Sequence, residues 1–152
     1  MSVAITLAIE SPRQPEVERM LEALDAYQST LYPPESNHLL DVEGLAAPNV
    51  RFIVARRGAV AVGCGALRID VGYGELKRMY VVPAARGHRL GRLILDRIEA
   101  EARRAGLRCL RLETGIHQPE ALALYRAAGY AEREAFGEYA ADPLSVFMEK
   151  IL

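Results

Sequence analysis

The stretch VVPAARGHRLGRLIL, residues 81–95, joins the end of an apolar, strand-like run to the start of an amphipathic helix. The turn between them holds two arginines, a histidine and two glycines. Such a turn is either an ordinary surface connection or a place where an anion binds at a helix N-terminus. The second reading has a physical basis, because the first N–H groups of a helix lack intrahelical partners and carry partial positive charge.

The residues of this turn suit a bound phosphate. Gly87 and Gly91 remove side chains that would keep a ligand from the backbone, while Arg86, Arg89 and Arg92 add positive charge around the same point. Residues 74–111 hold ten Lys or Arg against four Asp or Glu. This local excess of six stands out in a chain whose formal net charge is -1.

The length and composition predict one domain over residues 1–152, because 152 residues with 51% hydrophobic content can bury a sizeable core. The net charge of -1 and a pI near 6.3 argue against a general polyanion-binding protein, so nucleic acid is not an expected partner. Every run of apolar residues is shorter than a membrane span, and the N-terminus lacks a basic leader. We therefore expect neither membrane insertion nor export.

The two cysteines are expected to be buried thiols. Cys64 and Cys109 each lie inside an apolar, strand-like run, with no Cys or His nearby at metal-ligand spacing. His38, His88 and His117 also lack a paired ligand at such spacing, so no metal site is expected. Free thiols suit a reducing compartment, and the predicted location is the cytoplasm.

Hydrophobic periodicity and turn residues predict the order of the elements. The predicted elements are a strand at 3–10, a helix at 14–31, a long connection at 31–49 with a short helical turn around 36–44, a hairpin within 50–70, a strand at 73–82, a helix at 90–106, a strand at 108–115, a helix at 118–129, and a closing antiparallel pair at 130–136 and 144–152. In the helix at 90–106, Leu90, Leu93, Ile94, Ile98 and Ala105 are expected on one face.

Antiparallel hairpins early in the chain and one strand–helix–strand crossover later indicate the fold class. We predict an α/β (α+β) fold with a mixed, mostly antiparallel sheet of about seven strands flanked by helices, and not a doubly wound parallel sheet.

The turn fits neither of two common phosphate loops. The chain has no G-x-x-x-x-G-K-[ST] string, and RGHRLG, residues 86–91, does not have the spacing of the dinucleotide fingerprint. It does resemble [Q/R]-x-x-G-x-[G/A], the pyrophosphate-binding motif of the GNAT superfamily of acyl-CoA-dependent N-acetyltransferases. Arg86, Leu90 and Gly91 match its arginine or glutamine, its apolar residue and its last glycine, whereas Arg89 replaces the middle glycine.

The resemblance extends through most of the chain. ELKRMYVVP, residues 75–83, looks like the fourth strand of the family, and HQPEALALYRAAGY, residues 117–130, is similar to its N-x-x-A-x-x-L-Y-x-x-x-G-[FY] signature, with Gln118 in place of the Asn. ELKRMYV, LETG and DPLSVFMEK together resemble a bacterial subgroup often labelled IAA acetyltransferase, a label that fixes no acceptor.

The resemblance implies that acetyl-CoA is a co-substrate and that the acetyl group passes directly to an amine. It also implies a coenzyme A site made of Met79, Tyr80, Val81, Arg86, Gly87, His88, Arg89, Leu90, Gly91, Arg92, Gln118 and Tyr125.

The transfer needs a neutral amine and a proton for the departing thiolate. The resemblance implies Glu75 as the first choice of general base, and Glu113 is the second. Glu75 could equally be a strand-edge charge paired with Lys77 or Arg78. The family signature assigns proton donation to Tyr125, and the competing interpretation is an aromatic residue packed in the core.

The resemblance also places the acceptor site between the connection after the first helix, with Tyr32, Glu35 and His38, and the C-terminal loop with Tyr139. Plain surface structure is the alternative for both segments. The acceptor is expected to be a small amine or an amino-acid-like metabolite, and a homodimer is compatible with the sequence. Two other functions remain open, namely a non-catalytic acyl-CoA-binding module and a protein or peptide N-acetyltransferase.

Overall fold

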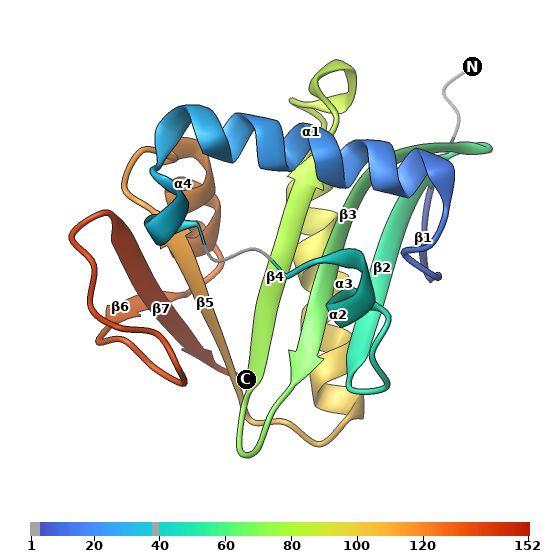
Figure 1. Cartoon of the computed structure of the whole chain (residues 1–152). Helices are drawn as coiled ribbons and strands as arrows, with labels where there is room; N and C mark the ends of the chain where they lie inside the picture. Colours follow the sequence, from blue (N-terminus) through green and yellow to red (C-terminus); the bar gives the residue numbers. More distant parts are fainter. Residues whose placement is uncertain (1–3, 38–39) are drawn as a thin grey trace.

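The computed structural model describes residues 4–37 and 40–152, and within them seven strands form one mixed sheet (Figure 1). The strands are β1 (Ile5–Ile9), β2 (Val50–Arg57), β3 (Val60–Ile69), β4 (Gly74–Val81), β5 (Cys109–Gly115), β6 (Ala131–Arg133) and β7 (Ser145–Ile151). Their spatial order is β1-β2-β3-β4-β5-β7-β6. Neighbouring strands are antiparallel except β4 and β5, which are parallel. This arrangement confirms the predicted fold class.

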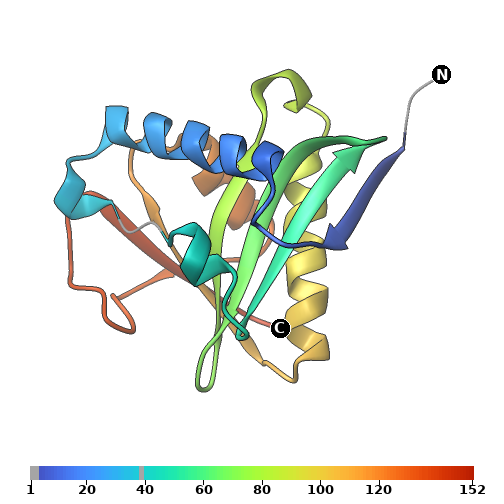
Figure 2. The same ribbon diagram turned by 45° about the vertical axis from the view of Figure 1, so that its right-hand side comes forward.

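Helices cover both faces of the sheet (Figures 1 and 2). The helices are α1 (Pro15–Leu31), α2 (Val42–Leu45), α3 (Leu90–Arg104) and α4 (Pro119–Ala127). Helices α1 and α2 pack on one face, whereas α3 and α4 pack on the other. The connection between β4 and β5 runs through α3, as expected for two parallel neighbours.

The alternation of side chains along β2 explains why both faces are covered. Phe52 and Val54 contribute to the core beneath α1 and α2, and Ile53 and Ala55 contribute to the core beneath α3 and α4. Successive strand residues point to opposite faces, so an unbroken apolar run needs cover on both sides.

Helix α3 is the amphipathic helix predicted after the glycine-rich turn. Leu90, Ile94 and Ile98 are buried in the core, as expected. Leu93, however, is 41% exposed, and Ala105 is exposed just after the end of the helix, so the predicted places of both on the buried face are wrong. Leu95 is fully buried instead, because the helix rotates about 100° per residue and brings positions 90, 94, 95 and 98 onto the same side.

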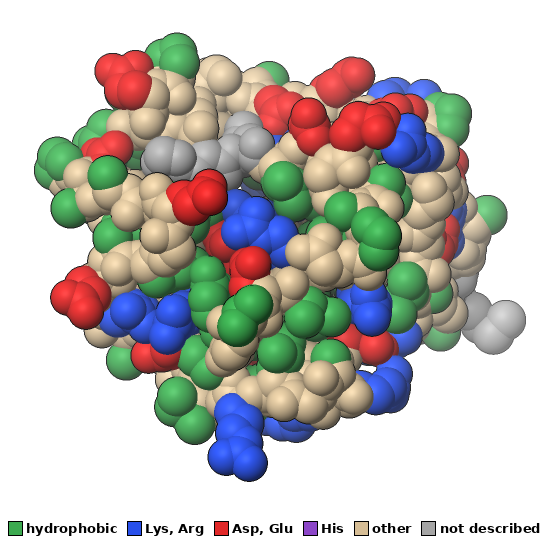
Figure 3. Space-filling view, turned by 60° about the horizontal axis from the view of Figure 1, so that its bottom comes forward, with side chains coloured by type: hydrophobic (Ala, Val, Ile, Leu, Met, Phe, Trp, Pro, Cys, Tyr) green, Lys and Arg blue, Asp and Glu red, His purple; other side chains and the backbone are tan. Residues whose placement is uncertain are grey.

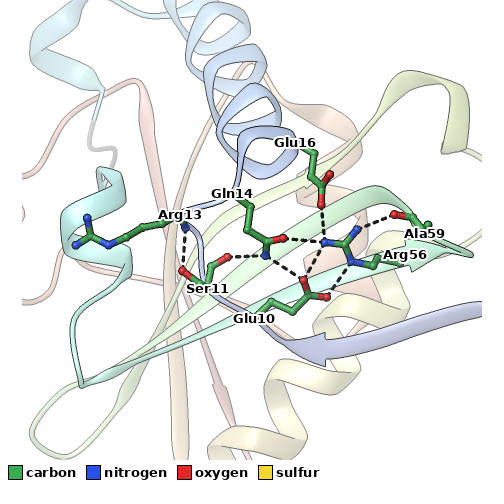
Figure 4. A network of polar contacts seen from close by, with 7 residues as sticks. All are labelled: Glu10, Ser11, Arg13, Gln14, Glu16, Arg56 and Ala59. Carbon is green, nitrogen blue, oxygen red and sulfur yellow. Dashed lines mark hydrogen bonds and ion pairs between the residues drawn. The ribbon is translucent and has the colours of Figure 1, made fainter.

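A polar network fixes the start of α1 against the β2–β3 hairpin (Figure 4). The Arg56 guanidinium donates to both carboxylate oxygens of Glu10 at 3.0 and 2.9 Å, and to Gln14 and Glu16 at 3.0 and 2.7 Å. Its remaining Nη donates to the carbonyl of Ala59 at 2.7 Å. Hydrogen bonds from Arg56 lower the pKa of Glu10. The network orients the segment that leads into α1.

The connection after α1 forms two short elements in place of the single turn predicted around 36–44. A 3-10 turn covers Pro34–Ser36, and α2 covers Val42–Leu45, where the Asp41 side chain caps the N–H of Gly44 at 2.9 Å. The Pro pair and the capping aspartate place these elements at the two ends of the connection.

Other expectations concern thiols, membranes and charge. Cys64 and Cys109 are both buried and unbridged, as predicted.

None of the helices formed by the described residues is long and apolar enough to cross a membrane. The face of the molecule in Figure 3 carries Lys and Arg side chains interspersed with Asp and Glu.

Candidate active site

Strands β4 and β5 lie side by side for only part of their length. They form three consecutive pairs, the last of which joins Leu76 to Leu112. Strand β4 continues to Val81 and β5 to Gly115, and beyond the paired segment the two strands diverge beneath α1 (Figure 1). A cavity of about 400 Å³ lies there, lined by both strands, α1, α4 and the loops that follow α1 and β6. We call it the central cavity.

A β-bulge shapes the wall that β4 contributes. Between β3 and β4 the register shifts by one residue, so Arg78 and Met79 lie opposite the single residue Gly65. Arg78 has a left-handed φ of 57°. Its side chain pairs with Asp25 on α1, whereas Met79 lies on the other face of the sheet, near Ile94 of α3. The bulge therefore directs the side chain of Arg78 toward α1.

Glu75 is held by three partners on the α1 side of the central cavity. Its carboxylate accepts hydrogen bonds from Arg68 at 2.9 Å and from the hydroxyl of Tyr139, and pairs with Lys77 at 3.1 Å. Lys77 also donates to the Tyr139 hydroxyl at 2.8 Å. The pairing predicted between Glu75 and Lys77 is present, but Arg78 pairs with Asp25 on α1 and not with Glu75.

Glu113 on β5 faces the same cavity in a different environment. Its carboxylate accepts a hydrogen bond of 3.3 Å from the Ser145 hydroxyl. Burial raises the pKa of Glu113 to about 7; the Ser145 hydrogen bond and the charge of Lys77 oppose the rise, and the charge of Glu75 adds to it. A carboxylate with a pKa near 7 can accept a proton at neutral pH and release it again.

Tyr125 lies on α4, where the opposite side of the sheet meets the cavity. It is 6% exposed, and its ring packs edge-on against Tyr130 with 5.9 Å between ring centroids. Tyr130 in turn donates from its hydroxyl to buried Glu99 on α3 at 2.9 Å. Burial, and then the charge of Glu113, raise the pKa of Tyr125 well above its usual value. The phenol therefore stays protonated and can act as a donor.

Tyr32, just after α1, closes one end of the central cavity. Its hydroxyl accepts from the backbone N–H of His117 at 3.1 Å and donates to the Gln118 side-chain oxygen at 3.3 Å. Its ring stacks on the His117 ring with 5.6 Å between centroids. The side chain of Gln118, where the resembled signature has Asn, is therefore engaged by Tyr32.

The start of α3 forms a second cavity of about 410 Å³, which we call the helix-mouth cavity. Its wall includes Arg86, Gly87, Arg89, Gly91 and Arg92. Gly87 and Arg89 both have left-handed backbones, with φ of 87° and 59°. A Cβ on Gly87 would meet no atom within 4 Å. The loop backbone is thus accessible, and three arginines surround it.

The structure brings most of the predicted site residues together around these two cavities. Central-cavity residues among them are Tyr32, Glu75, Met79, Tyr80, Val81, Arg86, Gly91, Glu113, Gln118, Tyr125 and Tyr139. Helix-mouth residues among them are Val81, Arg86, Gly87, Arg89, Leu90, Gly91 and Arg92. Glu35 and His88 are exposed and line neither cavity, and His38 lies outside the described residues. Leu90 is 3% exposed and also belongs to the core.

Sequence reasoning missed several polar residues of the central cavity. The sequence predicts Lys77 and Arg78 only as ion-pair partners of Glu75, whereas both line the cavity. Ser36 also lines it, and its hydroxyl donates to Asp142 in the β6–β7 loop at 2.6 Å. The only available signal was the charged run ELKR, because a link between residues 36 and 142 leaves no local pattern. Among the described residues, no group of three or more His, Cys, Asp or Glu could hold a metal ion.

Comparisons with known proteins agree with this architecture. The model of the acetyltransferase (GNAT) family matches residues 17–130. An IAA acetyltransferase of Azospirillum brasilense is 57% identical over 150 residues, covering 97% of this chain and 98% of the relative. A solved Klebsiella pneumoniae structure, assigned to the acyl-CoA N-acyltransferases, is 42% identical with a TM-score of 0.83 and 97% of each chain covered. PaiA N-acetyltransferase of Thermoplasma acidophilum, solved with coenzyme A, shares the fold at 18% identity, with a TM-score of 0.75 and 98% and 99% of the chains covered.

Proposed function

Because the chain belongs to the acetyltransferase (GNAT) family, we propose that it moves an acetyl group from acetyl-CoA to the primary amine of a small metabolite by direct transfer. The main observation that supports this proposal is the divergence of β4 and β5. It opens one cavity that has Tyr125 of α4 on one side of the sheet and Glu113 on the other, so that two substrates can meet from opposite faces.

Arg86, Arg89 and Arg92 would hold the diphosphate of coenzyme A at the helix mouth. The accessible backbone at Gly87 and the unpaired N–H groups of the first turn of α3 support this assignment. The CoA-bound structure of the PaiA relative shows that the same fold can hold this nucleotide. The thioester would then lie along the bulged part of β4, near Met79, Tyr80 and Val81.

Glu113 is the better general base of the two predicted carboxylates. Glu75 is committed to Arg68, Lys77 and Tyr139, whereas the described contacts of Glu113 include one long hydrogen bond. An alkyl ammonium with a pKa of about 10 must lose a proton before it can attack. Glu113, with a pKa of about 7, would take that proton directly or through water.

Tyr125 would supply the proton that the leaving thiolate needs. The amine nitrogen forms a bond to the acetyl carbon and then releases its surplus proton to solvent water, the carbon–sulfur bond breaks, and the electron pair of that bond stays on sulfur. The phenol of Tyr125 donates a proton to that sulfur and is reprotonated from solvent. Backbone N–H groups near Met79 would stabilise the oxyanion. The buried, unbridged cysteines favour a cytoplasmic setting for this activity.

The decisive experiment compares Tyr125→Phe with the matched control Tyr73→Phe, whose ring lies outside both cavities. Thiol release from acetyl-CoA is followed with a panel of small amines, and coenzyme A binding is measured by calorimetry. We expect kcat to fall at least about 100-fold in Tyr125→Phe, with CoA affinity unchanged, and both to persist in Tyr73→Phe. An unchanged rate in Tyr125→Phe would refute the acid role. Absence of CoA binding would refute the activity itself.

A further inference from the structure

The central cavity offers hydrogen-bond donors that its own walls do not use. Arg78 is 8% exposed, and its Nε is the one buried side-chain polar atom without a hydrogen-bond partner among the described residues. Its two Nη atoms are engaged by α1, one by the carboxylate of Asp25 and one by the carbonyl of Leu21. Arg78 lines the cavity, and because its Nε is itself buried, an acceptor in the cavity would reach this donor once the side chain turns toward it.

Lys77 lies on the same wall, and its ammonium group also has more N–H donors than partners. Its ammonium carries three N–H donors, and its hydrogen-bonding and ionic partners are the Tyr139 hydroxyl at 2.8 Å and Glu75 at 3.1 Å. The β-bulge is the reason that neighbouring residues of one strand both face α1. Two adjacent cations on one wall are suited to a ligand with an anionic oxygen group.

The charge balance of the cavity points the same way. On the α1 side, the charged side chains that line it among the described residues are Glu75, Lys77, Arg78 and Glu113. With both carboxylates ionised, these four charges cancel, and so do the charges of Asp25 beside Arg78 and Arg68 beside Glu75. When Glu113 takes the proton of the arriving ammonium, this wall gains one positive charge. A simple alkylamine leaves that charge uncompensated inside a buried site, which is unfavourable.

We propose that the acceptor is a zwitterion, an amine that also bears a carboxylate or phosphonate, with its anionic group on Arg78 and Lys77 and its amine facing Glu113. The inference rests on the proposed transferase function and narrows its acceptor class. Once its amine is neutral, a carboxylate acceptor is a monoanion and a phosphonate acceptor carries one or two negative charges, so either balances the positive charge of the wall. A diamine would add a further positive charge and is disfavoured.

The test compares acceptors that differ only in the anionic group. L-alanine, 1-aminoethylphosphonate and ethylamine are assayed as acceptors at saturating acetyl-CoA, with L-phenylalanine and phenethylamine as a larger pair. The measured quantity is the ratio of kcat/KM for the anionic acceptor to that for its plain amine. Comparing this ratio between wild type and variants cancels the intrinsic difference in amine basicity.

We expect Arg78→Met and Lys77→Met to lower the ratio about 10- to 100-fold, the loss expected when a charged hydrogen-bonding partner is removed. Asp25→Asn is the matched control, because it removes the carboxylate partner of Arg78 and leaves the guanidinium in place. Its ratio should stay at the wild-type value or rise. Thermal melting checks that each variant is folded, and Lys77→Met carries the test if Arg78→Met does not fold.

The same ratio in wild type and both folded variants overturns the inference, as does a wild-type preference for ethylamine or phenethylamine over its anionic counterpart. In those cases acetyl transfer itself still occurs, so the proposed function stands. If wild type acetylates none of these amines, the proposed function fails and this inference fails with it. A preference confined to the phosphonate or to the carboxylate identifies which of the two anionic groups the site accepts.

Discussion

Gly115 at the end of β5 and Tyr32 after α1 fit each other so closely that a Cβ at residue 115 would overlap the Tyr32 hydroxyl. The fit joins the α1 end of the central cavity to the strand that carries Glu113. It also keeps the Tyr32 hydroxyl between the N–H of His117 and the side chain of Gln118.

Gly115→Ala should therefore displace Tyr32. Overpacking of this kind lowers the free energy of unfolding by about 1–3 kcal/mol, and the shift should raise KM for the amine more than KM for acetyl-CoA. Urea unfolding and steady-state kinetics measure both effects. In a Tyr32→Ala background the same change should cost much less, because the clashing ring is gone. Equal costs in the two backgrounds would contradict the steric explanation.

Arg89 occupies a left-handed backbone position at the entrance to α3, which costs a residue with a Cβ about 1–2 kcal/mol. Arg89→Gly should therefore keep or raise stability while weakening CoA binding, because one cation leaves the helix mouth. Arg89→Asn separates the two effects, since Asn tolerates this conformation and carries no charge. Calorimetry with coenzyme A at two salt concentrations is the measurement. Unchanged affinity in both variants would exclude Arg89 from the phosphate site.

Glu113 makes stability depend on pH in a defined direction. Its folded pKa of about 7 lies above the usual 4.5, so the native state binds more protons than the unfolded state between these values. Stability is then lost as pH rises from about 5 to 8, by at most about 3 kcal/mol. Glu113→Gln should remove this loss, which urea unfolding across that range would detect. An identical pH dependence in the variant would contradict the raised pKa.

The same carboxylate should control the rate. We expect kcat/KM to rise with pH through an apparent pKa near 7, and Glu113→Gln to abolish that limb along with most of the activity. The pH–rate profile of Ser145→Ala tests whether Glu113 is the titrating group, because the Ser145 hydroxyl lowers the pKa of Glu113. Its removal should move the limb to higher pH. A limb that does not move would indicate that another group titrates.

The Arg56 network predicts a second, opposite pH effect. The pKa of Glu10 is lowered by Arg56, so its contribution to stability is present above the unfolded pKa and is lost as pH falls through that value and below. Arg56→Met should cost about 1–3 kcal/mol at pH 7 and less at pH 3. Denaturant unfolding at the two pH values measures this. Partly exposed Arg57 on the same strand provides the control Arg57→Met, which should have little effect at either pH.

Much of the fold could be predicted because the signals are local. The element order follows from apolar spacing and from Pro and Gly positions, such as Pro119 at the start of α4 and Gly129 after its end. The helix mouth is equally local, since its arginines and glycines are neighbours in sequence. A single stretch of chain therefore predicts both the turn rich in arginine and glycine and the helix that follows it.

The wall of the central cavity could not be predicted in the same way. Regular alternation along β4 would put Lys77 and Arg78 on opposite faces, and only the bulge brings both to the α1 side. The partners of Arg78 and Tyr32 lie 53 and 86 residues away in sequence. Such pairings depend on how the helices pack on the sheet, and neither composition nor residue spacing predicts them.

The bulge in β4 also bears on how this protein can change over evolutionary time. Removing Arg78 would restore a regular ladder with the other residues of β4 on their present faces, but the cation that the bulge places beside α1 would be lost, whereas a deletion elsewhere in the strand would exchange the faces of the residues beyond it. Insertions and deletions should therefore be tolerated in the loops after α1 and β6, where new acceptor preferences can arise. In the middle of β4 they should be lethal to activity, so that diversification of substrates proceeds around a strand of fixed length.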